Sequence, residues 1–218
     1  HLELNDLAAL DKNRFFATNN PSSSIWQKIK MFLFRQGDNH VVFFNGVKYS
    51  KVLGDFGFAN GITLDSSAKN LYVADFLSGE VRHFELSFSQ TNGKGSSKPK
   101  LVEKSKVYLG ILADNIEWDL GSDTDPALLI AGHPSVFQFI AHFTGKSKHA
   151  PSRILRVPLE KDGTIRISDI TVILPDDKSQ VVASSVASPY KVGSKSGMLI
   201  GTFYRGGIQD CSIAKHWQ

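Results

Sequence analysis

The stretch NGITLDSSAKNLYVAD, residues 60–75, decides the fold because its pattern recurs along the chain. It contains a small polar residue, a short alternating run, a polar turn, and a second run rich in apolar and β-branched residues. Alternation on both sides of a polar turn predicts a β-hairpin. The same order of features is found in residues 5–18, 115–132 and 185–202.

Further runs between these hairpins predict additional strands, because they are rich in β-branched and aromatic residues and are bounded by turn residues. These runs are residues 40–44, 46–53, 80–86, 136–143, 153–159 and 164–174. About four short strands in each repeat of about 50 residues indicate a β-propeller blade. The sequence therefore predicts an all-β fold, with about four propeller blades in one domain.

Polar residues stand at the start of the repeated hairpins. In a propeller the innermost strands point their first residues at the central axis, so Asn5, Asn60 and Asn115 are expected to converge. Together with the carboxylates of Asp6 and Asp114, these amides offer the oxygen ligands that suit calcium. The alternative is that each Asn only caps a turn at the start of its strand, as Asn often does.

Two segments differ from the hairpin pattern. Residues 22–35 have apolar residues at helical spacing after several serines, which predicts a short amphipathic helix. This helix is expected either to pack on the top face of the propeller or to contact a lipid surface. Residues 87–106 are polar, rich in Lys and contain Gly, so they predict a solvated loop.

Composition narrows the function classes. A chain of 218 residues with 41% hydrophobic residues is able to bury a core. The formal net charge is +4, but Lys and Arg are interleaved with Asp and Glu, so no nucleic-acid partner is predicted. The single cysteine, Cys211, has either a partner outside this chain or the role of an inert buried thiol.

A set of short motifs, taken in order, resembles the paraoxonase/arylesterase family. The motifs are LNDLAAL, FFATN, GFANGI, LADNI, GHPS and SSVASPYK…MLIGTF. Members of that family are calcium-dependent lactonases and esterases built as six-bladed propellers. The resemblance covers essentially the whole chain, but family members are longer at the N-terminus by roughly two blades. It therefore implies a partial propeller domain that lacks the N-terminal blades.

The resemblance also implies a set of calcium ligands. Asn5, Asn60, Asp114 and Asn115 match four protein ligands of the family's catalytic calcium, and Asp6 matches a ligand of its second, structural calcium. Two calcium sites are thus expected in the full-length protein, whose remaining acidic ligands would come from the N-terminal part. An alternative role for Asp114 is to help activate water, since a carboxylate beside a cation can serve as a base.

Further site residues follow from the same resemblance. His133 matches a histidine that lines the family's active-site pocket, which makes it a candidate catalytic residue; the alternative is a hydrogen-bonded histidine at the end of a strand. Phe58 and Ser185 match pocket-wall positions, and the family has Thr at the latter. Asn20 and Pro21 stand where the family has Asp-His, so any role of that pair is expected to be lost.

The implied function is calcium-dependent hydrolysis of lactones and aryl esters, with Ca²⁺ polarising the carbonyl and stabilising the oxyanion. The alternative is a catalytically inactive, membrane-associated chaperone or interaction scaffold. The expected partner is a small-molecule ester or lactone, and residues 22–35 match a family helix that associates with lipid. An open arc of blades also exposes sheet edges, which we expect to be covered either by the rest of the full-length protein or by another copy of the chain.

Location and redox state follow from the resemblance alone. The family is secreted or held at membranes that face the oxidising side, so an extracellular or membrane-associated protein is expected. Cys211 matches the cysteine that closes the family's propeller through a disulfide to the N-terminal strand.

Overall fold

The computed structural model describes residues 2–20, 38–89, 98–120, 125–175, 181–203 and 207–212. Two compact units divide the chain, unit 1 (His1–Tyr108) and unit 2 (Leu109–Gln218). The predicted helix at 22–35 lies outside the described residues. That the whole chain is one partial domain stays a prediction.

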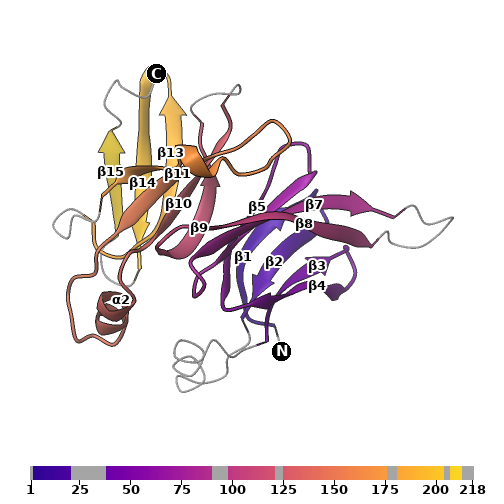
Figure 1. Cartoon of the computed structure of the whole chain (residues 1–218), viewed down its shortest axis with the longest axis horizontal. Helices are drawn as coiled ribbons and strands as arrows, with labels where there is room; N and C mark the ends of the chain where they lie inside the picture. Colours follow the sequence, from indigo (N-terminus) through magenta and orange to yellow (C-terminus); the bar gives the residue numbers. More distant parts are fainter. Residues whose placement is uncertain are drawn as a thin grey trace. The chain divides into compact units, whose positions relative to one another are not determined.

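Unit 1 contains two four-stranded antiparallel sheets, both coloured indigo to magenta in Figure 1. The strands of the first sheet are β1 (Leu4–Ala9), β2 (Phe15–Asn19), β3 (Asn39–Phe44) and β4 (Tyr49–Phe56). Those of the second are β5 (Ala59–Leu64), β6 (Asn70–Asp75), β7 (Glu80–Phe88) and β8 (Pro99–Tyr108). In both sheets the strands follow one another in sequence order, which is the meander of a propeller blade.

Unit 2 contains two further antiparallel sheets. The strands of the first are β9 (Leu112–Trp118), β10 (Ala127–His133), β11 (Arg153–Pro158) and β12 (Thr171–Leu174). Those of the second are β13 (Ser184–Val192), β14 (Lys195–Thr202) and β15 (Ile208–Ser212). All four predicted hairpins are confirmed as the first two strands of a sheet, and the fold is the predicted all-β propeller class with four blades.

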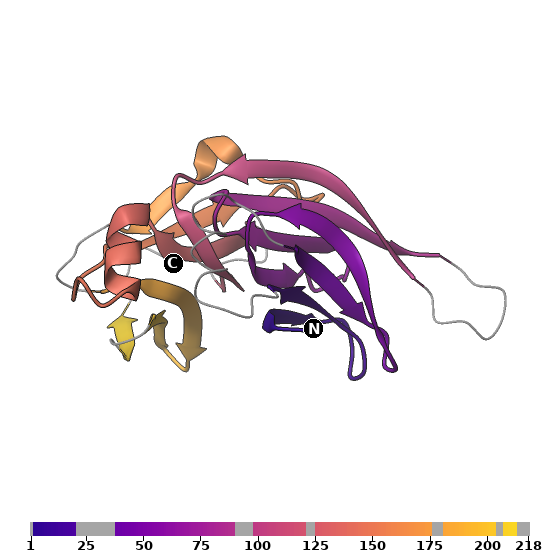
Figure 2. The same cartoon turned by 90° about the horizontal axis from the view of Figure 1, so that it is seen from below.

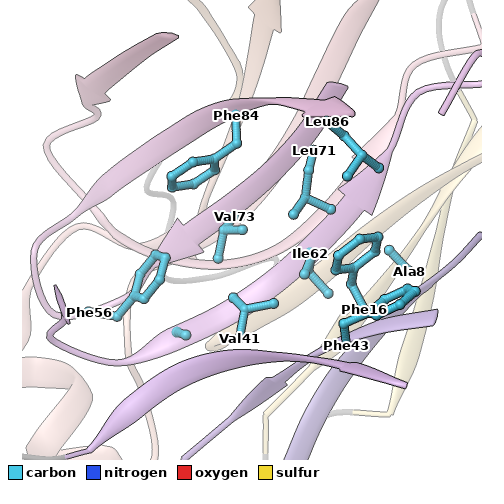
Figure 3. Close-up of a cluster of buried hydrophobic side chains, with 11 residues drawn as sticks. Ala8, Phe16, Val41, Phe43, Phe56, Ile62, Leu71, Val73, Phe84 and Leu86 are labelled. Carbon is cyan, nitrogen blue, oxygen red and sulfur yellow. The ribbon is translucent and has the colours of Figure 1, made fainter. Parts of the chain in front are cut away.

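The core of unit 1 lies between its two sheets. Phe16 and Phe43 pack with ring centroids 4.8 Å apart, and side chains from β5, β6 and β7 complete the cluster (Figure 3). The buried members are Ala8, Phe16, Val41, Phe43, Phe56, Ala59, Ile62, Leu71, Val73, Phe84 and Leu86. Each large side chain contributes about 1.5–3 kcal/mol by leaving water, so this cluster holds β1 and β5 against each other in unit 1.

The core of unit 2 is formed in the same way from alternate residues of neighbouring strands. Its buried members are Leu129, Ala131, Ile154, Val181, Ala187, Met198 and Ile200. β13 contacts both β9 and β10, so the first strands of the two sheets of this unit lie side by side. The packing therefore holds the start of β9 against the start of β13.

Residues 136–143 were predicted as a strand, and this prediction is wrong. They form helix α2 (Val136–Phe143), which begins after β10 (Figure 1). The Ser135 side chain caps the helix by accepting a hydrogen bond from the Gln138 backbone N–H at 3.4 Å. Phe139 and His142 are buried at a spacing of three residues, which is the period of a helix face.

The prediction of a solvated loop at 87–106 is also wrong for most of the residues that the structure describes in that range. β7 continues to Phe88, and β8 occupies residues 99–108 as its partner along a long hairpin (Figure 2). β8 is the outermost strand of its sheet, and most of its side chains are half-buried or exposed. Its charges are explained by cross-strand ion pairs, which stabilise a sheet modestly: Arg82–Glu103, Lys104–Glu85 at 3.2 Å and Lys106–Glu80 at 3.9 Å.

The run 164–174, predicted as one strand, is divided into three parts. Leu159 and Ile165 form an isolated antiparallel bridge, a 3-10 turn spans Ile167–Asp169, and only β12 (Thr171–Leu174) joins the sheet. The polar Ser168 and Asp169 explain the interruption, because their side chains bond to each other at 2.8 Å in a turn rather than alternating along a strand.

Candidate functional site

The first strand of every sheet carries a β-bulge at the residues that the sequence singled out. In β1, Asn5 and Asp6 lie between the pairs Leu4–Asn19 and Leu7–Ala17, so two residues of β1 face a single residue of β2. The other bulges contain Asn60 and Gly61 in β5, Asp114 and Asn115 in β9, and Ser185 in β13. A bulge redirects side chains at the rim of a sheet. The four candidate positions are therefore structurally equivalent.

Asp6 connects the two sheets of unit 1. Its Oδ1 accepts a hydrogen bond from the Leu7 backbone N–H at 2.7 Å, and its Oδ2 accepts one from the Ile62 backbone N–H at 2.9 Å. The carboxylate thus fixes the β1 bulge against β5. Asn5, its neighbour in the bulge, is exposed in the described chain.

Asn60 lies in the β5 bulge with an unusual environment. The residue is 6% exposed, and its Oδ1 atom is buried without a hydrogen-bond partner among the described residues. A buried acceptor left in this state costs about 1–3 kcal/mol. Such an atom suits a cation, since amide oxygens are calcium ligands. This observation fits the predicted role of Asn60 in metal binding.

Phe58 precedes this bulge and is held by its backbone. Its N–H donates to Asp75 Oδ1 at 2.9 Å, and the neighbouring Gly57 N–H donates to Asp75 Oδ2 at 2.9 Å. The Phe58 ring is half-buried, with its centroid 5.9 Å from that of Phe76. Asp75 therefore positions the entry to β5, while the ring of Phe58 keeps part of its surface open.

Asp114 and Asn115 lie in the β9 bulge of unit 2. The Asn115 Nδ2 donates to the Ser185 backbone carbonyl at 2.8 Å and to Asp114 Oδ1 at 3.3 Å. The first of these bonds joins the bulges of β9 and β13 across the two sheets of unit 2. Because the amide nitrogen is used in this way, the Asn115 Oδ1 is the atom left to act as an acceptor.

His133 ends β10 and lies beside this pair. Its Nε2 is 3.4 Å from Asp114 Oδ2, and the residue is fully buried. Its ring stacks on Phe139 of α2, with centroids 4.3 Å apart. Phe139 also packs on Phe203, at 5.8 Å. The structure thus brings together the two predicted catalytic residues, Asp114 and His133, and supports the histidine with aromatic rings.

Ser185, the predicted pocket-wall residue of β13, is half-buried and engages Asn115 through its backbone carbonyl. Two residues before it, Ala183 is fully buried with a φ of 52°, in the left-handed region that favours glycine. The Ala183 N–H donates to Ala150 and its carbonyl accepts from Phe203. The start of β13 is therefore held in a strained conformation, of a kind that is found often at functional sites.

Sequence reasoning missed two residues at these bulges. Asn20 follows β2, and its Nδ2 donates to the Ala59 carbonyl at 2.7 Å, directly before Asn60. That the role of the family's Asp-His pair is lost at Asn20 and Pro21 stays a prediction. Phe139 was missed because its segment was read as a strand. The signal for Phe139 was the serine cap of its helix, whereas no sequence signal marks Asn20.

Within the described ranges, no three or more His, Cys, Asp or Glu side chains are grouped so that they could hold a metal. The predicted ligands are mainly amides, with Asp114 as the acid of the set. A cation bound by this chain would thus depend on oxygens such as Asn60 Oδ1, whose burial without a partner fits that use.

Antiparallel meander sheets, each with its candidate residues in a bulge of the first strand, define a β-propeller with equivalent site positions. The model of the arylesterase family matches residues 2–211, so the chain belongs to the arylesterase family. The family expectation drawn from the short motifs is thereby confirmed.

Relatives of known name support the assignment. Serum paraoxonase/arylesterase 2 of Bos taurus is 28% identical over 207 residues, covering 92% of this chain and 51% of the relative. Mechanosensory abnormality protein 6 of Caenorhabditis elegans is 24% identical over 216 residues, covering 96% and 52%. The chain spans about half the length of the curated relatives it matches.

A solved structure agrees with the fold. The calcium-binding protein regucalcin of Agrobacterium tumefaciens aligns with a TM-score of 0.50 and 10% sequence identity, over 93% of this chain and 54% of that chain. At this level of identity the likeness bears on the propeller fold alone.

Proposed function

We propose that this chain belongs to a calcium-dependent hydrolase of lactones and aryl esters. The observation that carries the proposal is the buried Asn60 Oδ1, which has no partner among the described residues and lies at a bulge equivalent to that of Asp114 and Asn115. A bound cation would satisfy a buried oxygen that lacks a donor. Membership of the arylesterase family supports ester hydrolysis as the reaction class.

In this proposal Asn5, Asn60, Asp114 and Asn115 are ligands of the catalytic calcium, and Asp6 is a ligand of a second, structural calcium. When bound, calcium would polarise the substrate carbonyl and stabilise the negative charge that develops on its oxygen. Amide ligands would complete the coordination without cancelling the charge of the ion.

Asp114 and His133 have different roles in the proposal. Asp114 supplies the negative charge of the ligand set and remains the candidate that touches the reacting groups. His133 is fully buried, so we assign it as a positioning residue that orients the Asp114 carboxylate through the 3.4 Å contact. Phe58 and the side chain of Ser185, both half-buried, are the proposed pocket-wall residues.

The test is hydrolysis of phenyl acetate and of a δ-lactone by the full chain, with and without a chelator. Asn60→Ala is expected to abolish the chelator-sensitive rate, because it removes one oxygen ligand. Asn13→Ala, in the exposed turn between β1 and β2, is the matched control and should keep the rate. A rate that is insensitive to chelation would contradict the proposed mechanism.

A second candidate function is a catalytically inactive, membrane-associated chaperone or interaction scaffold. It is favoured by one relative, which is named for a mechanosensory abnormality and not for an enzyme. The two candidates differ in one result. Calcium would stabilise a scaffold, but a scaffold would hydrolyse neither phenyl acetate nor the δ-lactone. The hydrolase would be stabilised by calcium and would hydrolyse both substrates.

Partners and location are also proposals. Contact of residues 22–35 with lipid and association between copies of the chain stay predictions, as does a disulfide between Cys211 and a residue outside the chain. An extracellular or membrane-associated location is supported by relatives named as serum proteins. Among the described residues, no helix has both the length and the apolar character needed to span a membrane.

A further inference from the structure

We propose that the side-chain oxygen of Asn20 is an additional ligand of the cation proposed at Asn60. This inference rests on the proposed function and adds a residue that neither the motifs nor the family expectation assigned to the site. It is argued from two buried amide oxygens, both in unit 1, that lack partners among the described residues.

The orientation of the Asn20 side chain is set by its hydrogen bonds. Its backbone N–H donates to the Glu3 carbonyl at 3.1 Å, which fixes the residue at the end of β2. Its Nδ2 donates to the Ala59 carbonyl at 2.7 Å. Only the nitrogen of the Asn20 amide can donate a hydrogen bond to the Ala59 carbonyl. The Asn20 Oδ1 is therefore turned away from that carbonyl.

The freed oxygen is buried beside the β5 bulge. Asn20 and Asn60 are each 6% exposed, and the Oδ1 of each has no hydrogen-bond partner in the described part of the chain. The two residues are linked through Ala59, which precedes Asn60 and accepts the Asn20 hydrogen bond. Each of these acceptors lacks a donor and therefore attracts positive charge. A hard cation that binds several oxygens satisfies both.

Within the described part of the chain, the carboxylates that bond to the ends of β5 do not offer these oxygens a donor. The carboxylate of Asp6 accepts from Leu7 and Ile62, and that of Asp75 accepts from Gly57, Phe58 and Ser78. Both groups are acids, so they increase the negative potential at this end of β5 rather than neutralise it. The local chemistry therefore favours a divalent cation over an anionic ligand.

Asn39 provides a matched control. It is 3% exposed, and its Nδ2 donates to the Gly57 carbonyl at 2.6 Å, so it holds the connection between β4 and β5 through the same kind of bond. Unlike Asn20 Oδ1, the Asn39 Oδ1 is not an unpartnered buried atom. Loss of Asn39 removes a clamp without removing an available oxygen.

The experiment measures calcium affinity by titration calorimetry and the calcium-induced shift in melting temperature, using the full chain. Asn20→Leu is expected to weaken calcium binding about tenfold, because affinity follows the number of oxygen ligands. Asn20→Asp should lower the melting temperature without calcium and give a larger calcium-induced shift than the wild type. Asn39→Leu should lower the melting temperature and leave calcium affinity unchanged.

The outcomes separate this inference from the function on which it rests. If Asn20→Leu and Asn39→Leu both leave calcium affinity unchanged while Asn60→Ala abolishes it, Asn20 is only a clamp and the inference is overturned. If Asn60→Ala leaves calcium affinity unchanged, the proposed function fails as well. Should Asn20→Leu not fold, Asn20→Asp decides the question, because a calcium-induced shift no larger than that of the wild type overturns the proposal.

Discussion

The β5 bulge of unit 1 and the β9 bulge of unit 2 occupy equivalent positions but satisfy their polar groups differently. In unit 2, Asn115 bonds to the Ser185 carbonyl at 2.8 Å and Asp114 lies 3.4 Å from His133. In unit 1, Asn60 leaves a buried oxygen with no partner among the described residues. Both bulges are held by hydrogen bonds to a neighbouring sheet, but the β5 bulge also has a buried acceptor that is available to a ligand.

This difference indicates that some ligands of a cation site set its geometry, while others set its affinity. A ligand whose rotamer is fixed by protein contacts keeps the geometry before the ion binds. A ligand with an unsatisfied oxygen supplies free energy when the ion arrives, since the cost of burying that oxygen has already been met by the fold. We therefore expect substitutions in unit 2 to affect orientation and those in unit 1 to affect affinity.

The largest expected effect concerns the aromatic support that the β9 bulge has behind His133. Phe139→Ala should lower the free energy of unfolding by about 3–5 kcal/mol, as for other buried Phe residues. Phe137→Ala on the same helix should change it by less than about 0.5 kcal/mol, because Phe137 is 86% exposed. Urea unfolding of both variants measures the free energy of unfolding. Equal losses of stability in the two variants would show that α2 does not support the site.

The second prediction concerns the charge of the unit 2 bulge. Asp114→Asn preserves the shape of the side chain but removes its negative charge, so the chelator-sensitive rate should fall about 100-fold or more. Asp119→Asn is the control at the end of the same strand, since Asp119 pairs with Arg156 at 2.7 Å. It should lower the free energy of unfolding by about 1–3 kcal/mol and keep the rate. A normal rate in Asp114→Asn would contradict the assignment.

A third prediction uses pH to probe the unit 1 hairpin. Burial tends to raise the pKa of Asp65, but hydrogen bonds from Ser67, Asn70 and the Lys69 N–H outweigh it and hold this pKa below its usual value. The unfolded chain therefore takes up the proton at a higher pH, near the ordinary value of about 3.9. The stabilisation is complete above that pH and is lost as pH falls through the folded pKa.

Asp65→Asn should thus reduce the free energy of unfolding by about 1 kcal/mol at pH 6, after allowance for solvent screening. Compared with the wild type, the variant should lose less stability between pH 5 and pH 3. The unit 2 counterpart is Asp125, whose pKa is lowered by hydrogen bonds from Arg156 and Arg166. Its contribution should weaken in high salt, unlike that of Asp65. Identical salt responses of the two variants would be the contrary result.

The smallest effect is expected from backbone strain. Ala68 has a φ of 53° in the turn between β5 and β6, and Ala183 has a φ of 52° before β13. Ala68→Gly should raise the free energy of unfolding by about 0.5–1 kcal/mol, because glycine adopts this region without strain. Ala183 is fully buried, so its glycine variant also loses a packed methyl group and should gain nothing. Thermal unfolding of both variants tests this prediction. An equal gain in stability at both positions would contradict it.

Much of the fold could be predicted from the sequence, because alternation around a polar turn is a local signal. The four hairpins and the all-β class follow from that signal alone. β8 was mistaken for a loop because the lysines of an outer strand pair across to acids on β7, and such pairing is not visible within the segment itself. α2 was mistaken for a strand because Phe-rich runs have high β propensity, while its cap is a single serine.

The candidate site was predicted less completely. The motifs selected Asn60, Asp114 and His133, and the structure brings the last two within 3.4 Å. No sequence pattern predicted that these residues lie in bulges, since a bulge depends on the register of two strands. Asn20 was missed for a related reason: its hydrogen bond to Ala59 spans 39 positions and two sheets.

The most direct test of the central claim is a crystal structure of the full chain with calcium, in which anomalous scattering locates the ion. The account predicts a peak about 2.3–2.6 Å from Asn60 Oδ1, the usual distance for calcium and oxygen. An Asn60 Oδ1 that accepts a hydrogen bond from protein or water, with no anomalous peak beside it at saturating calcium, would contradict the account.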